Sequence, residues 1–266
     1  MPISDIYIYA LRHLEGFDEE AIETAISLAK YDVVEDNEDF IDFVNFNIED
    51  RKFPHITKPF KIHDIEKAVD IAKENESYMP HYIDASSPMY PKKILQSSIA
   101  NRATLSYIGD LKNIERKTIM ITGSSAITEN AKQASTYFAS FFSKHGYNIL
   151  TSFSDGCEKS AFSGCVKASG FSTFILPHRI EYLSEAEKGM ILPEIMAGRS
   201  TIISASKSKV VNKRTRDVSY RYLAAILDCL IVPQLSFDDD VINLVINCLM
   251  LKKPVFFIRY RRKVNE

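Results

Sequence analysis

The chain has 266 residues, of which 45% are hydrophobic, so it is long enough for one large domain, or for one domain with a helical appendage. Its net charge of -2 gives no overall basic signature of a nucleic-acid-binding protein. The sequence contains no apolar run typical of a transmembrane helix, no basic segment typical of a signal peptide and no cysteine spacing typical of a zinc site. We therefore expect a cytoplasmic protein with reduced core thiols and without a metal or cofactor.

The first third of the chain is predicted to be helical and is rich in acidic residues. The segments 17–31 and 62–75 carry apolar residues at helical spacing, and Asp64 is a candidate N-cap of the second segment. The acidic residues between Glu15 and Asp50 should repel a phosphate backbone. We expect residues 1–80 to form a small helical N-terminal module, followed by a proline-containing linker segment over residues 81–116.

The remainder of the chain, residues 117–266, alternates between strand and helix patterns. Short β-rich runs lie at 118–122, 148–152, 172–176, 201–204, 229–233 and 254–258. Apolar runs that alternate with amphipathic helices are typical of a parallel sheet covered on both faces. We therefore predict an α/β fold with a Rossmann-like, doubly wound, mostly parallel sheet.

Polar turns follow three of the predicted strands and are candidates for a phosphate-binding site. The candidate residues are Gly123, Ser124, Ser125 and Thr128 after the first strand, Ser154 and Gly156 after the second, and Ser236 after the fifth. Ligands of doubly wound sheets bind beyond the carboxyl ends of the strands, so we expect the three turns to meet there. The Gly-Ser-Ser turn should have a helix N-terminus directly behind it, whose N–H groups suit an anion. Each turn taken alone is equally typical of a helix N-cap, a role for which Ser236 or Asp238 is the candidate after the fifth strand.

Positive charge collects in a second region that could contact phosphates. The basic residues are Lys207, Lys209, Lys213, Arg214 and Arg216. They are expected to contribute to an anion site, and the alternative is a solvated charged loop. The sequence has no G-x-G-x-x-G, no phosphate-binding P-loop and no G-x-S-x-G elbow, so we predict no catalytic residues.

Several segments together resemble the DprA/Smf family of DNA-processing proteins. They are "YPKKILQSSIANRATLSYIGDLKNI" (90–114), "IMITGSSAIT", "TSFSDGCEKSAF" and "VSYRYLAAILDCLIVPQ". Gly156 and Glu158 fall on a glycine and an acid of the family pattern, and Arg221 and Asp228 match a family arginine and aspartate. Ser125 stands where the family usually has arginine, and acids replace its serine-glycine-serine turn after the fifth strand. The likeness covers roughly residues 90–260, without a C-terminal winged helix.

This resemblance implies a protein that binds single-stranded DNA along the carboxyl edge of the sheet, with Arg221 at the start of a helix beside that edge. It also implies a homodimer that loads the RecA recombinase in natural transformation and has no enzymatic activity. Two other interpretations stay open. One is a divergent relative that binds a nucleotide or another small phosphorylated ligand. The other is a phosphoribohydrolase-type enzyme, whose proline-glycine-glycine-x-glycine-threonine turn is absent here.

Overall fold

We describe the protein from a computed structural model, which covers residues 3–29, 32–74, 79–236 and 239–260. The chain divides into two compact units, Met1–His81 and Tyr82–Glu266. The first unit is helical, as the sequence predicts, and contains α1 (Asp5–Leu11), α2 (Glu19–Leu28), α3 (Asn37–Glu49) and α4 (Ile62–Glu74). Its largest fully buried side chains include Leu11, Phe40, Phe53 and Ile65. Burial of this apolar surface stabilises the unit.

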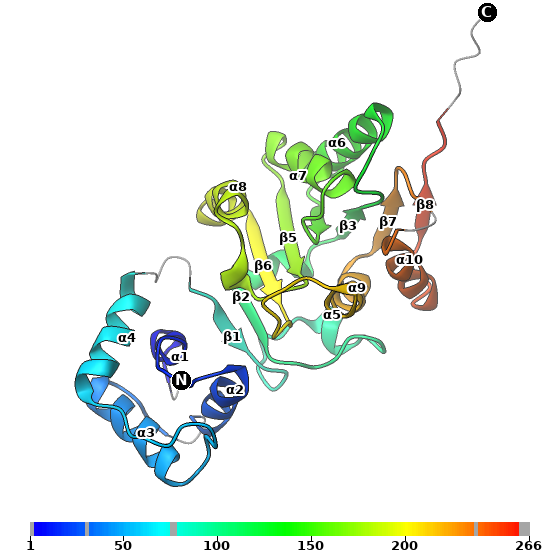
Figure 1. The fold of residues 1–266 in the computed structure, drawn as a ribbon. Coiled ribbons are helices and arrows are strands. Elements are labelled where there is room, and N and C mark those ends of the chain that lie inside the picture. The colour runs from blue at the N-terminus through cyan, green and yellow to red at the C-terminus, as the bar shows by residue number, and fades with distance from the viewer. Residues whose placement is uncertain (1–2, 30–31, 75–78, 237–238, 261–266) are drawn as a thin grey trace, which may run out of the picture. The chain divides into compact units, whose positions relative to one another are not determined.

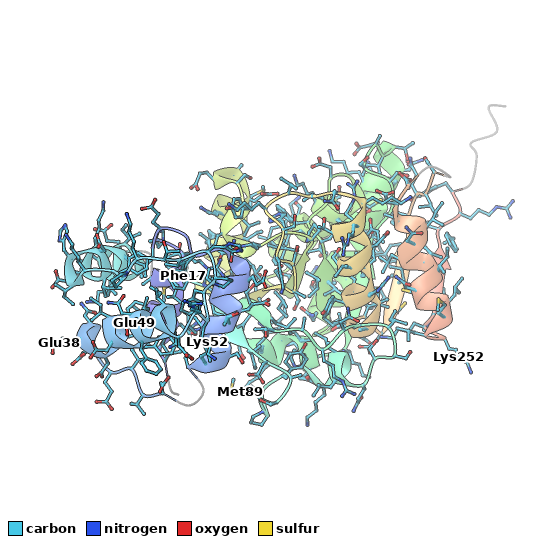
Figure 2. The ribbon with its side chains drawn as sticks, turned by 60° about the horizontal axis from the view of Figure 1, so that its bottom comes forward. Phe17, Glu38, Glu49, Lys52, Met89 and Lys252 are labelled. Carbon is cyan, nitrogen blue, oxygen red and sulfur yellow. The ribbon has the colours of Figure 1, made fainter. Side chains whose placement is uncertain are left out.

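Aspartate side chains support the starts of three helices in this unit. Asp18 accepts a hydrogen bond from the backbone N–H of Ala21, and Asp36 caps α3 in the same way. Asp64, predicted to be an N-cap, lies instead inside the first turn of α4, and its carboxylate accepts a hydrogen bond from the Lys61 N–H at 3.1 Å. Because anions favour helix N-termini, part of the acidity of this unit has a structural cause. Other acids, such as Glu38 and Glu49 near the two ends of α3, are exposed (Figure 2).

The second unit is built on an eight-stranded sheet with the order β1-β2-β6-β5-β4-β3-β7-β8 (Figure 1). The strands are β1 (His81–Ile83), which starts at the last residue of the helical unit, β2 (Leu105–Gly109), β3 (Thr118–Ile121), β4 (Asn148–Thr151), β5 (Phe171–Leu176), β6 (Ser200–Ser204), β7 (Cys229–Val232) and β8 (Val255–Phe257). The strands from β3 to β8 pair in parallel, and β2 is antiparallel to β6. The predicted doubly wound, mostly parallel fold is confirmed. Residues 81–116, expected to be a linker, contribute two strands to the sheet.

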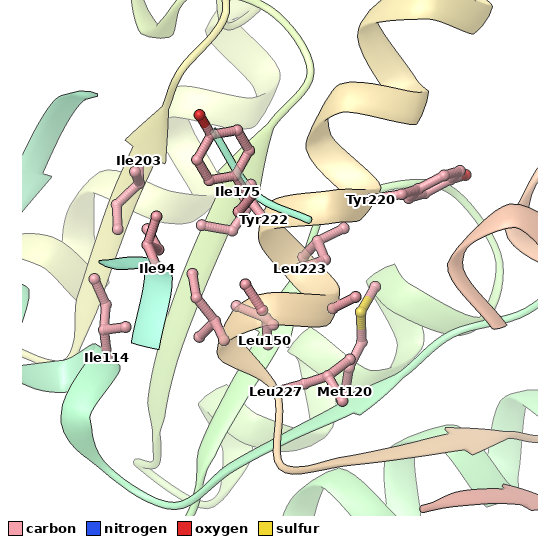
Figure 3. Close-up of a cluster of buried hydrophobic side chains, with 14 of the residues drawn as sticks. Ile94, Ile114, Met120, Leu150, Ile175, Ile203, Tyr220, Tyr222, Leu223 and Leu227 are labelled. Atoms are coloured by element: carbon pink, nitrogen blue, oxygen red, sulfur yellow. The ribbon is translucent and has the colours of Figure 1, made fainter. Parts of the chain in front are cut away.

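Helices connect the strands and cover both faces of the sheet. They are α5 (Lys92–Leu95), α6 (Glu129–Lys144), α7 (Cys157–Lys167), α8 (Glu185–Met196), α9 (Lys213–Ile226) and α10 (Val241–Met250), with short 3-10 helices at Leu111–Glu115 and Ile180–Tyr182. Alternate residues of a strand point to opposite faces. Accordingly, Met120 packs in a cluster with Leu223 of α9 and with Leu227, the C-cap of this helix (Figure 3), whereas Ile119 and Ile121 pack in a different cluster, which includes residues of α6 and α7.

Among the described residues, no helix is long and apolar enough to cross a membrane. All four cysteines are free thiols, and Cys157, Cys165 and Cys248 are buried. Burial raises the pKa of the Cys165 thiol to about 11, so this side chain stays protonated at neutral pH. The cysteines therefore behave as small apolar core residues, as the sequence predicts.

Candidate functional site

The turns that follow β3 and β7 are in direct contact at the carboxyl ends of these neighbouring strands. The Ser124 N–H donates to the Gln234 carbonyl at 3.0 Å. A Cβ atom built on Gly123 would lie 2.0 Å from the same Gln234 oxygen, so only glycine allows the two backbones to approach this closely. The glycine that the sequence singles out therefore serves the packing of one turn on the other.

The turn after β4 joins the first turn through a glycine and a buried acid. Gly156 is the N-cap of α7 and has a φ of 79°; a Cβ there would lie 2.3 Å from the Ser124 carbonyl oxygen. The buried Glu158 carboxylate accepts hydrogen bonds from the Thr122 hydroxyl at 2.7 Å and from the Thr151 hydroxyl at 2.8 Å. It also accepts from the Ser152 N–H at 2.6 Å. Glu158 is thus a positioning residue that fixes the first two turns relative to each other.

The helix behind the Gly-Ser-Ser turn starts later than the sequence analysis expects. Helix α6 begins at Glu129, and Thr128 is its N-cap, so the expectation of a helix N-terminus directly behind Gly123, Ser124 and Ser125 is wrong. The Gln234 side-chain oxygen accepts hydrogen bonds from the Thr128 N–H at 3.0 Å and from the Thr128 hydroxyl at 2.9 Å. The turn after β7 therefore already uses part of the hydrogen-bonding capacity at this helix start.

The hydroxyl of Ser124 in the first turn donates its hydrogen bond to an acidic side chain of the same chain. Ser124 is buried, and its Oγ donates to the Asp239 carboxylate at 2.6 Å. The same Asp239 oxygen accepts from the Ser236 N–H at 2.7 Å. Ser236, a predicted cap of the following helix, does not hold that position, because α10 begins at Val241 with Asp240 as its N-cap. The alternative cap, Asp238, lies outside the described residues.

A cavity of about 300 Å³ lies beside these turns, close to the carboxyl ends of β4 and β5. Three of the predicted residues, Ser125, Ser154 and Arg216, line it. Further parts of its wall come from His178 after β5 and from Ser219 and Tyr220 of α9. Its volume is at the lower end of the range for small-ligand pockets. The structure thus brings residues of the first two predicted turns and of the basic segment to one cavity.

Two basic side chains, Arg216 and Lys159, line this cavity. Lys159 pairs with the Asp155 carboxylate at 2.7 Å, whereas Arg216 has hydrogen-bonding capacity left over. One terminal nitrogen lies 3.0 Å from the Asp240 carboxylate. The Arg216 Nε atom is buried and has no hydrogen-bond partner among the residues that the structure describes. The Nε atom is closed to solvent, so a ligand oxygen would contact the terminal nitrogens of this side chain, which is 42% exposed.

His178 adds a titratable group to the same cavity. Its Nδ1 atom lies 2.8 Å from the Arg179 carbonyl oxygen, which can only accept a hydrogen bond, so Nδ1 carries the proton. Burial lowers the pKa of His178 below its ordinary value, although Glu187 and Glu181 oppose this effect. The imidazole is therefore neutral at pH 7. Over the described residues, no cluster of three or more His, Cys, Asp or Glu side chains could hold a metal ion.

The basic segment runs from the connection after β6 into α9. Lys207 and Lys209 lie in the connection, Lys213 and Arg214 lie in the first turn of α9, and all four are exposed. Hydrogen bonds from the Ser206 and Ser208 backbones to nearby serine hydroxyls order the connection. Cations at a helix N-terminus oppose the helix dipole, so folding does not favour Lys213 and Arg214 there. An anionic ligand bound at this helix start would favour both cations.

Two residues matched to the family pattern lie away from the cavity. Arg221 is exposed in the second half of α9, so the expectation that it begins this helix is wrong, because α9 begins at Lys213. Asp228 precedes β7 at the opposite edge of the sheet. Its carboxylate accepts from the Thr118 N–H at 2.7 Å and pairs with Lys93 at 3.1 Å, a role in holding the strand ends together.

Gln234, Asp239 and His178 are not among the predicted site residues, although the first two belong to the predicted polar turn after the fifth strand. A signal exists for Gln234 and His178, because both come one or two residues after a predicted strand, where side chains reach the carboxyl edge. Asp239 lies in the acidic run 238–240 of the turn after the fifth strand, but this pattern does not specify its partner. Its contact with Ser124 joins residues far apart in the chain, and acids before a helix are common for structural reasons.

The doubly wound sheet and the site at its carboxyl edge define a protein of the Rossmann-like class. Comparison with protein-family models matches residues 81–262 to DNA recombination-mediator protein A. Because this match spans more than half of the sequence, the chain belongs to the DNA recombination-mediator protein A family, and the predicted resemblance to DprA/Smf proteins of DNA processing is confirmed.

Solved structures of this family have the same fold. The chain is similar to DNA processing protein A from Streptococcus pneumoniae, with 12% identity, a TM-score of 0.61, and coverage of 99% of this chain and 89% of that chain. It is also similar to DNA processing protein A from Helicobacter pylori, whose single-stranded DNA binding mode has been described, with 19% identity, a TM-score of 0.57, and coverage of 69% and 83%. The comparison with curated protein sequences gives no match.

Proposed function

We propose that this protein binds single-stranded DNA at the carboxyl edge of the sheet, with phosphates held by the first turns of α9 and by the adjoining cavity. The observation that carries the proposal is the position of Lys213 and Arg214 at the N-terminus of α9, in the same first turn as Arg216 of the cavity wall. Basic side chains and the positive end of a helix dipole act together on an anion. Membership of a DNA-processing family supports a DNA phosphate as that anion.

Hydroxyl groups and the cavity arginine provide the short-range contacts in this proposal. Ser125 and Ser154 are exposed in the cavity wall, and the Arg216 side chain is 42% exposed. Because Ser125 provides no charge where the family usually has arginine, we expect weaker binding than with an arginine at that position. The remaining affinity should come mainly from Lys and Arg contacts to phosphates and should decrease with salt.

Binding of a labelled oligo(dT), measured by fluorescence anisotropy at two salt concentrations, tests the proposal. The double substitution Lys213→Ala and Arg214→Ala should weaken binding and flatten the log–log salt dependence by roughly 0.7 for each phosphate that the protein no longer neutralises. The matched control is Lys144→Ala with Lys167→Ala, which removes two exposed lysines from the last turns of α6 and α7, at the other edge of the sheet. Equal binding by the two double variants would contradict the proposal.

A nucleotide or another small phosphorylated ligand is the second candidate. The size of the cavity favours it, because about 300 Å³ can hold a small ligand but not a polymer. Such a ligand would stabilise the folded state, so a free nucleotide should raise the melting temperature. Single-stranded DNA predicts instead a gain in affinity with oligonucleotide length.

Two finer statements belong to the same proposal. We propose that the protein acts as a non-enzymatic mediator that helps to load the RecA recombinase in natural transformation. Recombinase assembly on single-stranded DNA, measured with and without the protein, would test this role.

We also propose that the protein forms a homodimer. Exposed apolar side chains lie on α10 and on the same face of the edge strand β8, namely Ile246, Leu249, Met250 and Phe257. Lys252, labelled in Figure 2, lies in the turn between these two elements. An apolar patch of this kind is typical of a protein interface.

A further inference from the structure

Two acidic side chains immediately before α10, Asp239 and Asp240, bind polar groups of the site. Asp239 accepts hydrogen bonds from the Ser124 hydroxyl at 2.6 Å and from the Ser236 N–H at 2.7 Å. Asp240 pairs with Arg216 at 3.0 Å. We propose that Asp239 and Asp240 are internal anions that compete with ligand phosphate and thereby set the affinity of the site. This inference rests on the proposed function, because it names the residues that determine how strongly that site binds.

The contacts of Asp239 match those that a phosphate oxygen would make in a turn. A hydroxyl and a backbone N–H converge on one oxygen of the carboxylate, and both bonds are charge-assisted. Ser124 is only 3% exposed, so its hydroxyl can reach a ligand only when Asp239 no longer accepts its hydrogen bond. Asp239 therefore removes one anion contact that the Gly-Ser-Ser turn could offer.

Asp240 acts on the charge of the cavity and is the easier of the two to displace. The side chains of Arg216 and Asp240 are 42% and 35% exposed, and an ion pair of this exposure contributes little to stability. A phosphate that approaches Arg216 meets the Asp240 charge next to it, and like charges at close range are unfavourable. Replacement of Asp240 by the neutral and nearly isosteric asparagine removes this repulsion and leaves Arg216 unpaired.

A purely structural role makes a different prediction. Acids near a helix N-terminus stabilise the helix, and Asp239 ties the turn after β7 to the turn after β3. If the two acids had only this structural role, Asp240→Asn and Asp239→Asn would lower the stability of the protein and leave its affinity for the ligand unchanged. Melting temperatures, measured alongside affinity, separate the two roles and show whether each variant is folded.

The test compares the wild type with Asp240→Asn, Asp239→Asn and Arg216→Ala, using labelled oligo(dT) at low salt and the thermal shift caused by inorganic pyrophosphate. The control is Glu185→Gln, which makes the same charge change at an 88% exposed acid that pairs with Lys188 and not with Arg216. We expect Asp240→Asn to bind oligo(dT) about tenfold tighter than the wild type, and Glu185→Gln to differ by less than about twofold. Asp239→Asn, if folded, should also bind more tightly.

Each other outcome decides between the inference and the proposed function. Equal gains for Asp240→Asn and Glu185→Gln would show an effect of net charge alone and overturn the inference. A second outcome is that the wild type binds oligo(dT), that Arg216→Ala loses this binding, and that neither Asp variant gains affinity. In that case the inference fails while the proposed function stands. If no protein binds oligo(dT), but pyrophosphate stabilises Asp240→Asn more than the wild type, the proposed function fails and the inference stands. No response to either probe by any protein would overturn both.

Discussion

At the residue scale, Glu158 shows how a buried acid can organise a site without contacting a ligand. Its carboxylate accepts hydrogen bonds from Thr122, Thr151 and Ser152. Glu158→Ala would leave these buried donors without an acceptor, so we expect the free energy of unfolding in urea to fall by about 2–4 kcal/mol. Glu129→Gln, at an exposed acid of α6, should change it by less than about 0.5 kcal/mol. Similar values for both variants would contradict the role given to Glu158.

Gly123 offers a second test at the same scale. A methyl group at this position would meet the Gln234 carbonyl oxygen at 2.0 Å, so Gly123→Ala must push two turns apart. We expect a loss of about 2 kcal/mol or more in the free energy of unfolding. Gly189→Ala is the matched control, because a Cβ at this helical position of α8 meets no atom within 4 Å and alanine is the better helix former. A fully stable Gly123→Ala variant would disprove the close approach of the turns.

We expect His178 to make ligand binding depend on pH. Because burial lowers its pKa, the imidazole is neutral at pH 7 and gains a proton only below its ordinary value of 6.5. The added positive charge favours a bound phosphate, so oligo(dT) affinity should rise as pH falls from 7 to below 6.5. The unfolded chain binds this proton more readily, so the His178 contribution to stability is complete above pH 6.5 and is lost as pH falls below it. His178→Gln should flatten the affinity profile, whereas His145→Gln, at an exposed histidine after α6, should keep the wild-type slope.

At the element scale, α9 combines a buried face with a charged start. Leu223 and Leu227 pack on the sheet (Figure 3), while Lys213 and Arg214 lie at the N-terminus, where cations oppose the helix dipole. Lys213→Ala with Arg214→Ala should therefore raise the free energy of unfolding by about a few tenths of a kcal/mol while it weakens oligo(dT) binding. Chemical denaturation and anisotropy on the same sample measure both effects. A loss of stability together with weaker binding would indicate a structural role for these residues.

The elements themselves were predictable where their pattern is strong. Buried strands such as β3 and β4 form short apolar runs, and glycine or serine marks the turns after them, so strands and turns were placed within one or two residues. β1 and β2 were missed because they are short or partly exposed, and β2 lacks a clear alternation. The predicted position of Arg221 at a helix start is wrong because α9 begins at the Asn212–Thr215 capping box, with its first residue, Lys213, eight residues earlier in the chain than Arg221. The Asp239–Ser124 contact is tertiary and has no local signal.

At the scale of the whole molecule, the acidic first unit and the basic segment of the second keep opposite charges in separate parts of the sequence. This division restricts the attraction for phosphate to the sheet unit.

The apolar patch on α10 and β8 offers a surface for a second copy of the chain. Leu249→Glu with Met250→Glu should lower the molar mass measured by light scattering from dimer to monomer, because buried charges are costly. Met196→Glu, at a 73% exposed residue of α8, should leave the mass unchanged. A monomeric wild type would contradict the dimer.

The most direct test of the central claim adds a charge to the cavity. Ser125 lines the cavity and is exposed, so Ser125→Arg places a guanidinium beside Arg216 without filling buried space. Oligo(dT) anisotropy at two salt concentrations should show binding tighter by about 1–2 kcal/mol at low salt, with a steeper salt dependence. Ser163→Arg, at an exposed position of α7 outside the cavity wall, should give a much smaller gain. If Ser125→Arg gives no gain, while a free nucleotide raises the melting temperature of the wild type, the site binds a small ligand and the claim of single-stranded DNA binding is contradicted.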